Sequence, residues 1–121
     1  NFYTVYNVSK IAPKLMENSS NSSMINIITP YAEIPVEGTS LYSSSKAALM
    51  NFSKSLALEF RVHKIRVNSL MCNTIDTKLN RKLMPKENFD AWTKPEEIFD
   101  TMSIIMKEES KFINGEIIRL D

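Results

Sequence analysis

Tyr42 and Lys46, four residues apart, are the pair of side chains in this sequence with the clearest potential for chemistry. On a helix this spacing puts both on one face, one turn apart, so the ammonium can lie near the phenol. A free tyrosine has a pKa of about 10, too high for efficient proton exchange at neutral pH. A cation at roughly 4 to 5 Å stabilises the phenolate and lowers the pKa toward neutrality. The spacing therefore predicts a proton-transfer pair.

The same pair also has a plain structural interpretation. Tyrosine and lysine occur at this spacing on many surface helices, where the tyrosine packs its ring and the lysine is solvated. The sequence around Tyr42 and Lys46 is needed to choose between a proton-transfer pair and an ordinary surface pair.

The composition is that of an ordinary globular chain. The 121 residues are 43% hydrophobic and 24% charged, which suits one small domain. With 15 basic and 14 acidic residues the formal charge is +1, without the basic stripe that nucleic-acid binding requires. No long apolar run and no charged-then-apolar leader is visible. We therefore expect no nucleic acid or membrane partner, and a cytoplasmic location.

Cysteine, histidine and glycine are scarce. Cys72 and His63 are the only residues of their types, so one chain can build neither a disulfide nor a multi-ligand zinc or iron site, and no metal is expected. Cys72 closes an apolar stretch and is interpreted as packing, and His63 as a favourable cation near a helix end. The two glycines, Gly38 and Gly115, cannot form the glycine-rich turn that cradles a dinucleotide pyrophosphate.

Hydrophobic periodicity predicts alternating helices and strands. Apolar residues recur at three- and four-residue steps in the helical segments and run together in the short strand segments. The predicted order is a helix over residues 1–17, a strand over 24–29, a helix over 42–62, a strand over 65–71, a helix over 95–107 and a strand over 116–120. This order predicts the α/β class, with a parallel sheet covered on both faces.

Three segments between the predicted helices and strands are expected to be loops. The polar run 18–23 should be a loop, because its side chains compete for backbone hydrogen bonds. Residues 30–41 contain two prolines and Gly38 and should be irregular. Residues 73–95 form a long segment with short helical pieces, and loops of this length usually cover a site.

Several landmarks now appear in order. Thr29 ends a strand, Tyr42 follows thirteen positions later, and Lys46 four after that. Val67-Asn68 lies in the strand predicted after the helix that carries Tyr42, and Phe112-Ile-Asn-Gly115 is the turn into the last predicted strand. Together these residues resemble the C-terminal half of the short-chain dehydrogenase/reductase family. The resemblance implies half of a Rossmann-type doubly wound sheet, with residues 1–121 as the catalytic portion of a single domain and the dinucleotide-binding half absent from the sequence.

The resemblance implies an oxidoreductase that transfers hydride between NAD or NADP and a carbonyl, alcohol or pterin-like substrate. Tyr42 would exchange the proton, Lys46 would assist it and bind the nicotinamide ribose, and Thr29 would polarise the reacting oxygen. Asn1 would hold a proton-relay water. Cofactor contacts are expected from Tyr42, Lys46, Ile75 and Thr77.

Several of these residues also have a purely structural interpretation. Thr29 is also a suitable β-branched strand end, and Asn1 a suitable helix N-cap. Phe89 and Trp92 in the long loop are interpreted as packing locally. The seven methionines are interpreted as core filler.

The sequence departs from the family pattern at two places. Thr29 stands where serine is usual, and Cys72-Asn73 where Pro-Gly is usual, which affects the path of the nicotinamide loop. Residues 76–96 resemble the corresponding loop of dihydropteridine reductases, although those enzymes generally lack the catalytic hydroxyl that Thr29 provides.

The resemblance also implies a homodimer or homotetramer built on the helices over residues 1–17 and 42–62. A second hypothesis is a truncated, non-catalytic relative that acts as a binding or assembly module. In that case Tyr42 should be buried away from any cleft. The strand over 24–29 would also expose an unpaired edge, which invites aggregation.

Overall fold

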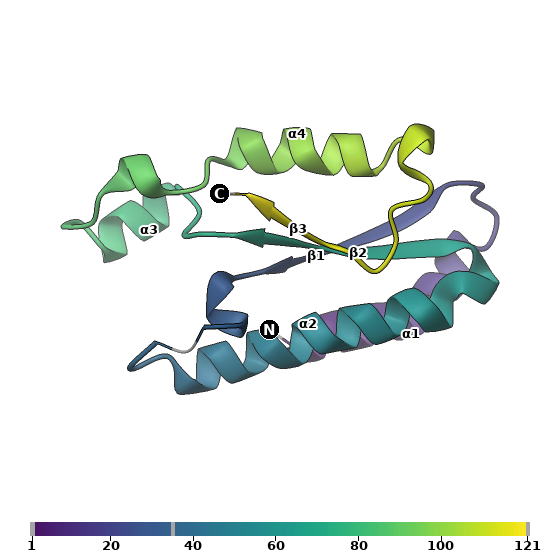
Figure 1. Ribbon diagram of the computed structural model, residues 1–121, viewed down its shortest axis with the longest axis horizontal. Coiled ribbons are helices and arrows are strands. Elements are labelled where there is room, and N and C mark those ends of the chain that lie inside the picture. The colour runs from purple at the N-terminus through teal and green to yellow at the C-terminus, as the bar shows by residue number, and fades with distance from the viewer. Residues whose placement is uncertain (1, 35, 121) are drawn as a thin grey trace.

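Three parallel strands form the centre of the chain, and helices cover both faces of their sheet (Figure 1). The structure is a computed structural model and describes residues 2–34 and 36–120. The strands are β1 (Ser22–Ile28), β2 (Ile65–Cys72) and β3 (Ile117–Leu120). They lie side by side in the order β1-β2-β3, and β2 pairs in parallel with both neighbours.

Two long helices lie on one face of this sheet and a shorter one on the other (Figure 1). On the first face are α1 (Phe2–Met16) and α2 (Ser40–Glu59), and on the second is α4 (Pro95–Ile105). The short helix α3 (Lys78–Leu83) lies in the long segment after β2, beyond the end of the sheet. Four 3-10 turns complete the described elements: η1 (Pro30–Ala32), η2 (Phe60–His63), η3 (Phe89–Ala91) and η4 (Glu108–Ser110).

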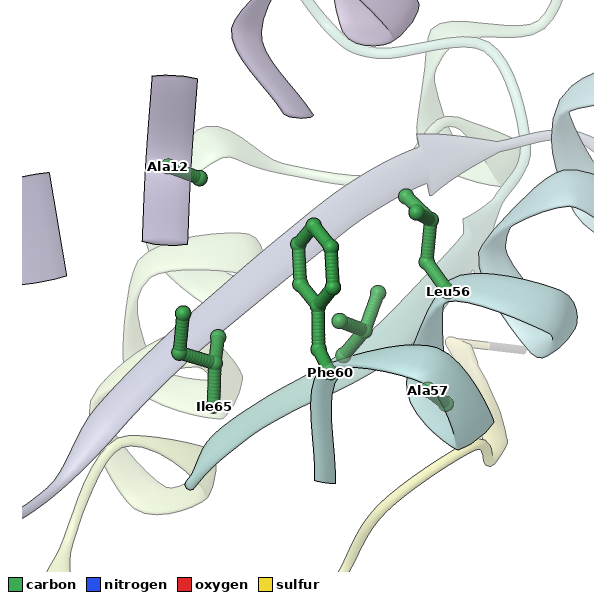
Figure 2. Close-up of a cluster of buried hydrophobic side chains, with 6 residues drawn as sticks. Ala12, Leu56, Ala57, Phe60 and Ile65 are labelled. Atoms are coloured by element: carbon green, nitrogen blue, oxygen red, sulfur yellow. The ribbon is translucent and has the colours of Figure 1, made fainter. Parts of the chain in front are cut away.

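The core lies between α1, α2 and the central strand. All eight residues of β2 are buried, as expected for a strand that is paired on both edges and covered on both faces. Figure 2 shows the cluster in which Leu56 of α2 and Phe60 of η2 pack toward Ile65 of β2 and Ala12 of α1. The stripe predicted for the long helix is thus confirmed, with Leu49, Leu56 and Phe60 buried and Phe52 partly buried.

A buried arginine joins the second helical layer to the sheet. Arg66 of β2 is 8% exposed, and its Nη1 donates to the carbonyl oxygens of Ile105, Ser110 and Ile113 at 2.9, 3.2 and 3.3 Å. Its Nη2 donates to Asn21 Oδ1 at 3.0 Å. The guanidinium therefore satisfies a carbonyl group left open at the end of α4, and these carbonyls replace the water that the charge loses.

The predicted order of helices and strands is confirmed, with shifts of a few residues at the ends. The main difference is at β1, which begins at Ser22 inside the polar run predicted to be a loop. Ser22 and Ser23 are in the strand because their backbones pair with Ile65 and Arg66, a partnership that local side-chain chemistry does not reveal. No helix in the described ranges is long and apolar enough to cross a bilayer.

Candidate active site

The ends of β1 and β2 and the start of α2 border one cleft of about 570 Å³. Thr29 follows β1 and lines it, as do Tyr42 and Lys46 from the first turns of α2. The carboxyl ends of parallel strands meet at the same edge of a sheet, which is where open α/β sheets usually bind ligands. Three side chains predicted from sequence spacing therefore reach one concave surface.

Tyr42 and Lys46 lie on the same side of α2, as their spacing predicts. The Lys46 Nζ lies 6.0 Å from the centroid of the Tyr42 ring and donates a hydrogen bond of 2.9 Å to the carbonyl oxygen of Ile27. Tyr42 is 43% exposed, so its ring is accessible from the cleft. The condition set for the non-catalytic hypothesis, a Tyr42 buried away from any cleft, is not met.

The predicted lowering of the tyrosine pKa is wrong for the described chain. Burial raises the pKa of Tyr42 above its ordinary value of 10.0, and hydrogen bonding with the Thr29 side chain only partly opposes this rise. Burial also lowers the pKa of Lys46 from its ordinary value of 10.5. Desolvation of the phenol is the largest cause, and the neighbouring Cys72 and Tyr31 raise the pKa of Tyr42 further, while the Lys46 ammonium is bonded to the Ile27 carbonyl.

The predicted cofactor contacts separate into two groups. Ile75 lines the cleft together with Tyr42 and Lys46. Thr77 does not line it; this exposed residue is the N-cap of α3, where its hydroxyl accepts a hydrogen bond of 3.1 Å from the Asn80 backbone N–H. Asn1, predicted to hold a relay water, lies outside the described residues.

Cys72 and Trp92 also line the cleft, although the sequence favoured packing as the role of each. Cys72 is 3% exposed yet lines the cleft close to Lys46, whose charge lowers the thiol pKa while burial raises it more. Trp92 is 8% exposed and also lines the cleft. Its local packing is confirmed as well, because its ring centroid lies 4.8 Å from that of Phe89. The sequence signal that could have found them was position: Cys72 ends β2, and Trp92 lies near the end of the long segment that follows.

The long segment after β2 covers the cleft, as its length predicts. Its two ends are joined by hydrogen bonds of 2.9 Å from the Thr93 N–H to the Thr74 carbonyl and from the Asp76 N–H to the Thr93 carbonyl. Within it Arg81 binds both carboxylate oxygens of Asp76, at 2.6 and 2.7 Å. These contacts make the segment a structured wall of the cleft.

Metal chemistry is not indicated by side-chain placement. Within residues 2–34 and 36–120, no three His, Cys, Asp or Glu side chains form a group that could hold a metal ion.

Comparison with known proteins identifies the family. The family model described as short chain dehydrogenase matches residues 1–88, which is more than half of the chain. The chain belongs to the short-chain dehydrogenase family. Its three-stranded parallel sheet is accordingly part of a Rossmann-type fold.

Curated members of the short-chain dehydrogenase family match the chain over its whole length. A carbonyl reductase (NADPH) 2 from Sus scrofa is 27% identical over 132 residues, which cover 100% of this chain and 54% of the relative. A 3-oxoacyl-(acyl-carrier-protein) reductase from Thermotoga maritima is 27% identical over 129 residues, which cover 100% of this chain and 52% of the relative. The chain spans about half the length of the curated relatives that it matches.

Solved structures of dehydrogenases show the same arrangement of elements. An aldohexose dehydrogenase from Thermoplasma acidophilum is 27% identical with a TM-score of 0.86, over 99% of this chain and 54% of that chain. An acetoin dehydrogenase from Enterobacter cloacae is 25% identical with a TM-score of 0.80, over 97% of this chain and 49% of that chain.

Proposed function

We propose that this short-chain dehydrogenase interconverts a carbonyl compound and the matching alcohol with a nicotinamide cofactor, NAD or NADP. The observation that carries the proposal is the meeting of Thr29, Tyr42 and Lys46 on one cleft at the carboxyl ends of parallel strands. The named activities of its relatives, a carbonyl reductase and a 3-oxoacyl reductase among them, support the same reaction class.

Tyr42 is the proposed proton donor for reduction. The Tyr42 hydroxyl is protonated at neutral pH and can give a proton to the carbonyl oxygen as negative charge develops there, although its raised pKa makes it a weaker acid than a free tyrosine. Thr29 lies close enough to share a hydrogen bond with Tyr42, so one substrate oxygen can accept from both hydroxyls. The bound cofactor supplies the hydride in reduction and accepts it in oxidation.

Lys46 is the proposed contact to the nicotinamide ribose. An ammonium has three N–H donors, and the Ile27 carbonyl takes one of them. The remaining donors suit vicinal ribose hydroxyls, and Ile75 lines the same cleft. The donor set therefore fits the nicotinamide end of the cofactor. The Thr77 hydroxyl accepts from Asn80 and can still donate its own hydrogen, so a cofactor contact from this residue also stays a prediction.

We further propose that α1 and α2 form an interface between copies of the protein. Both helices present apolar side chains to solvent, including Leu15 at 74%, Leu58 at 62% and Ile11 at 55%. Closed symmetric homo-oligomers commonly bury faces of this kind. A homodimer or homotetramer would result.

The decisive experiment is a reductase assay of the protein expressed from its complete open reading frame, with NADH and NADPH over a carbonyl panel. We expect Tyr42→Phe to lower kcat by roughly 100- to 10,000-fold, because a positioned general acid contributes that much. Tyr3→Phe removes the same atom from an exposed position on α1 and should leave turnover unchanged.

Full turnover in Tyr42→Phe would contradict the proton-donor role. A folded wild-type protein that turns over no carbonyl with either cofactor would favour the binding or assembly module instead.

A further inference from the structure

Glu87 places a carboxylate on the wall of the proposed substrate cleft. It is the only acidic residue among the described lining residues, and Lys46, whose ammonium stays charged while it binds the Ile27 carbonyl, is the only lysine or arginine. Glu87 lies at the end of a turn closed by a hydrogen bond of 3.3 Å from its N–H to the Met84 carbonyl. Its carboxylate has no hydrogen-bond or ion-pair partner among residues 2–34 and 36–120, so it is open to a ligand.

The cations of the same segment do not line this cleft. Residues 73–95 contain Lys78, Arg81, Lys82, Lys86 and Lys94, and none of the five is among its lining residues. Arg81 is fixed elsewhere by its two bonds to Asp76, and its guanidinium carbon lies 4.8 Å from the centroid of the Phe89 ring. This segment contains five basic residues, yet the only charged side chain that it contributes to the lining of the cleft is the Glu87 carboxylate.

The same cleft offers surfaces suited to a flat apolar group. Tyr31, Met84 and Trp92 all line it, and the Trp92 ring is held against Phe89. Aromatic rings and a thioether make favourable contacts with an aromatic ligand. The charge and the apolar surface together define a preference for one ligand class.

We infer that the cleft selects aromatic carbonyl compounds that are neutral or cationic and discriminates against anionic ones, with Glu87 as the residue that sets this preference. The inference rests on the proposed function for the carbonyl group. The charge preference itself is a property of binding and can be measured without turnover.

Three para-substituted benzaldehydes of similar size test the inference: 4-formylbenzoate, methyl 4-formylbenzoate and 4-formyl-N,N,N-trimethylanilinium. Trp92 is the only tryptophan of this chain and lines the cleft, so quenching of its fluorescence reports binding directly. Free N-acetyltryptophanamide titrated with the same ligands gives the contribution of ligand absorbance. Because the substituents also change the electrophilicity of the aldehyde, each Kd and kcat/KM is compared with that of the wild type for the same ligand.

In Glu87→Gln we expect Kd to rise about 2- to 5-fold for the cation, to fall by a similar factor for the anion and to change less than about 2-fold for the ester, as for exposed charge pairs. Glu87→Lys should give larger changes in the same directions, and added salt should reduce both. Asp90→Asn removes a carboxylate from the same segment outside the lining of this cleft and should change none of the three.

Equal effects on all three ligands, tighter wild-type binding of the anion, or no quenching by any of them would overturn the inference. Turnover that depends on Tyr42 but shows no charge preference would refute the inference and leave the proposed function standing. Charge-ordered binding without hydride transfer to any carbonyl would refute the proposed function and leave the preference standing.

Discussion

The surroundings of Tyr42 decide its acidity more than the sequence spacing does. Lys46 lies one helical turn away, but its ammonium bonds to the Ile27 carbonyl and its own pKa is lowered by burial. Desolvation is the largest cause of the raised pKa of the phenol, which is therefore a weaker acid than a free tyrosine. A protonated Tyr42 is poised for reduction, whereas alcohol oxidation needs its deprotonated form.

At the residue scale we predict the direction of the Tyr42 titration. A group with a raised pKa keeps its proton as pH rises past the ordinary value and loses it only above that value. The difference between the tyrosinate absorbance titrations of wild type and Tyr42→Phe, measured without cofactor, should therefore report one group that titrates above pH 10.0. Tyr3→Phe provides the matched subtraction for an exposed tyrosine. A Tyr42 titration between pH 7 and 8 would instead restore the interpretation that Lys46 acidifies the phenol.

Polar contacts fix the turn that leads into β3. Asn114 Oδ1 accepts a hydrogen bond of 2.8 Å from the buried Val67 N–H, and its Nδ2 donates to the Ala57 carbonyl at 2.9 Å. Gly115 follows with a φ of +83°, a left-handed conformation that disfavours other residues, and its N–H donates to the Val67 carbonyl at 2.9 Å. One side chain thus joins α2, β2 and the entry to β3.

At the element scale we predict that Asn114→Ala lowers the free energy of unfolding by about 2 to 4 kcal/mol, because it removes two hydrogen bonds and leaves a buried N–H unpaired. Urea unfolding at fixed protein concentration measures this loss. Asn51→Ala, a change of the same kind at an exposed position on α2, should stay within about 0.5 kcal/mol of wild type. Similar stability for the two variants would show that Asn114 does not hold the turn.

At the scale of the whole molecule, the described sheet is open at β1. In the described ranges β1 pairs only with β2 (Figure 1). The helices α1 and α2 on one face of the sheet have exposed apolar side chains. An open strand edge and an exposed apolar helical face both favour further packing. Our proposal assigns the helical face to a second copy of the protein.

We predict that Leu58→Asp on α2 shifts the assembled protein toward the monomer, because a carboxylate would have to be buried in an apolar interface. Light scattering coupled to size exclusion measures the mass. Leu79→Asp on α3 is the matched control, since Leu79 is 64% exposed and Leu58 is 62% exposed. An oligomer that survives Leu58→Asp, or one that Leu79→Asp disrupts equally, would argue against an interface on α2.

The order of the elements was predictable because it depends on local patterns. Helical periodicity indicated α1 and α2, and a short segment rich in Ile, Val, Leu and Met indicated the strand β2, although Arg66, Asn68 and Ser69 within it are buried as well. The same local spacing put Tyr42 and Lys46 on one face of α2. The start of β1 was not predictable, because Ser22 and Ser23 are strand residues only through pairing with residues more than forty positions away.

The sequence by itself determined which residues stand together on each helix and strand, since side-chain direction along an element follows from its period. Only the tertiary structure decided the direction of the Tyr42 pKa, the hydrogen bonds of Arg66 and the presence of Glu87 and Trp92 at the cleft. These properties depend on what burial removes from water and on which distant groups replace it. Sequence spacing carries no direct record of either.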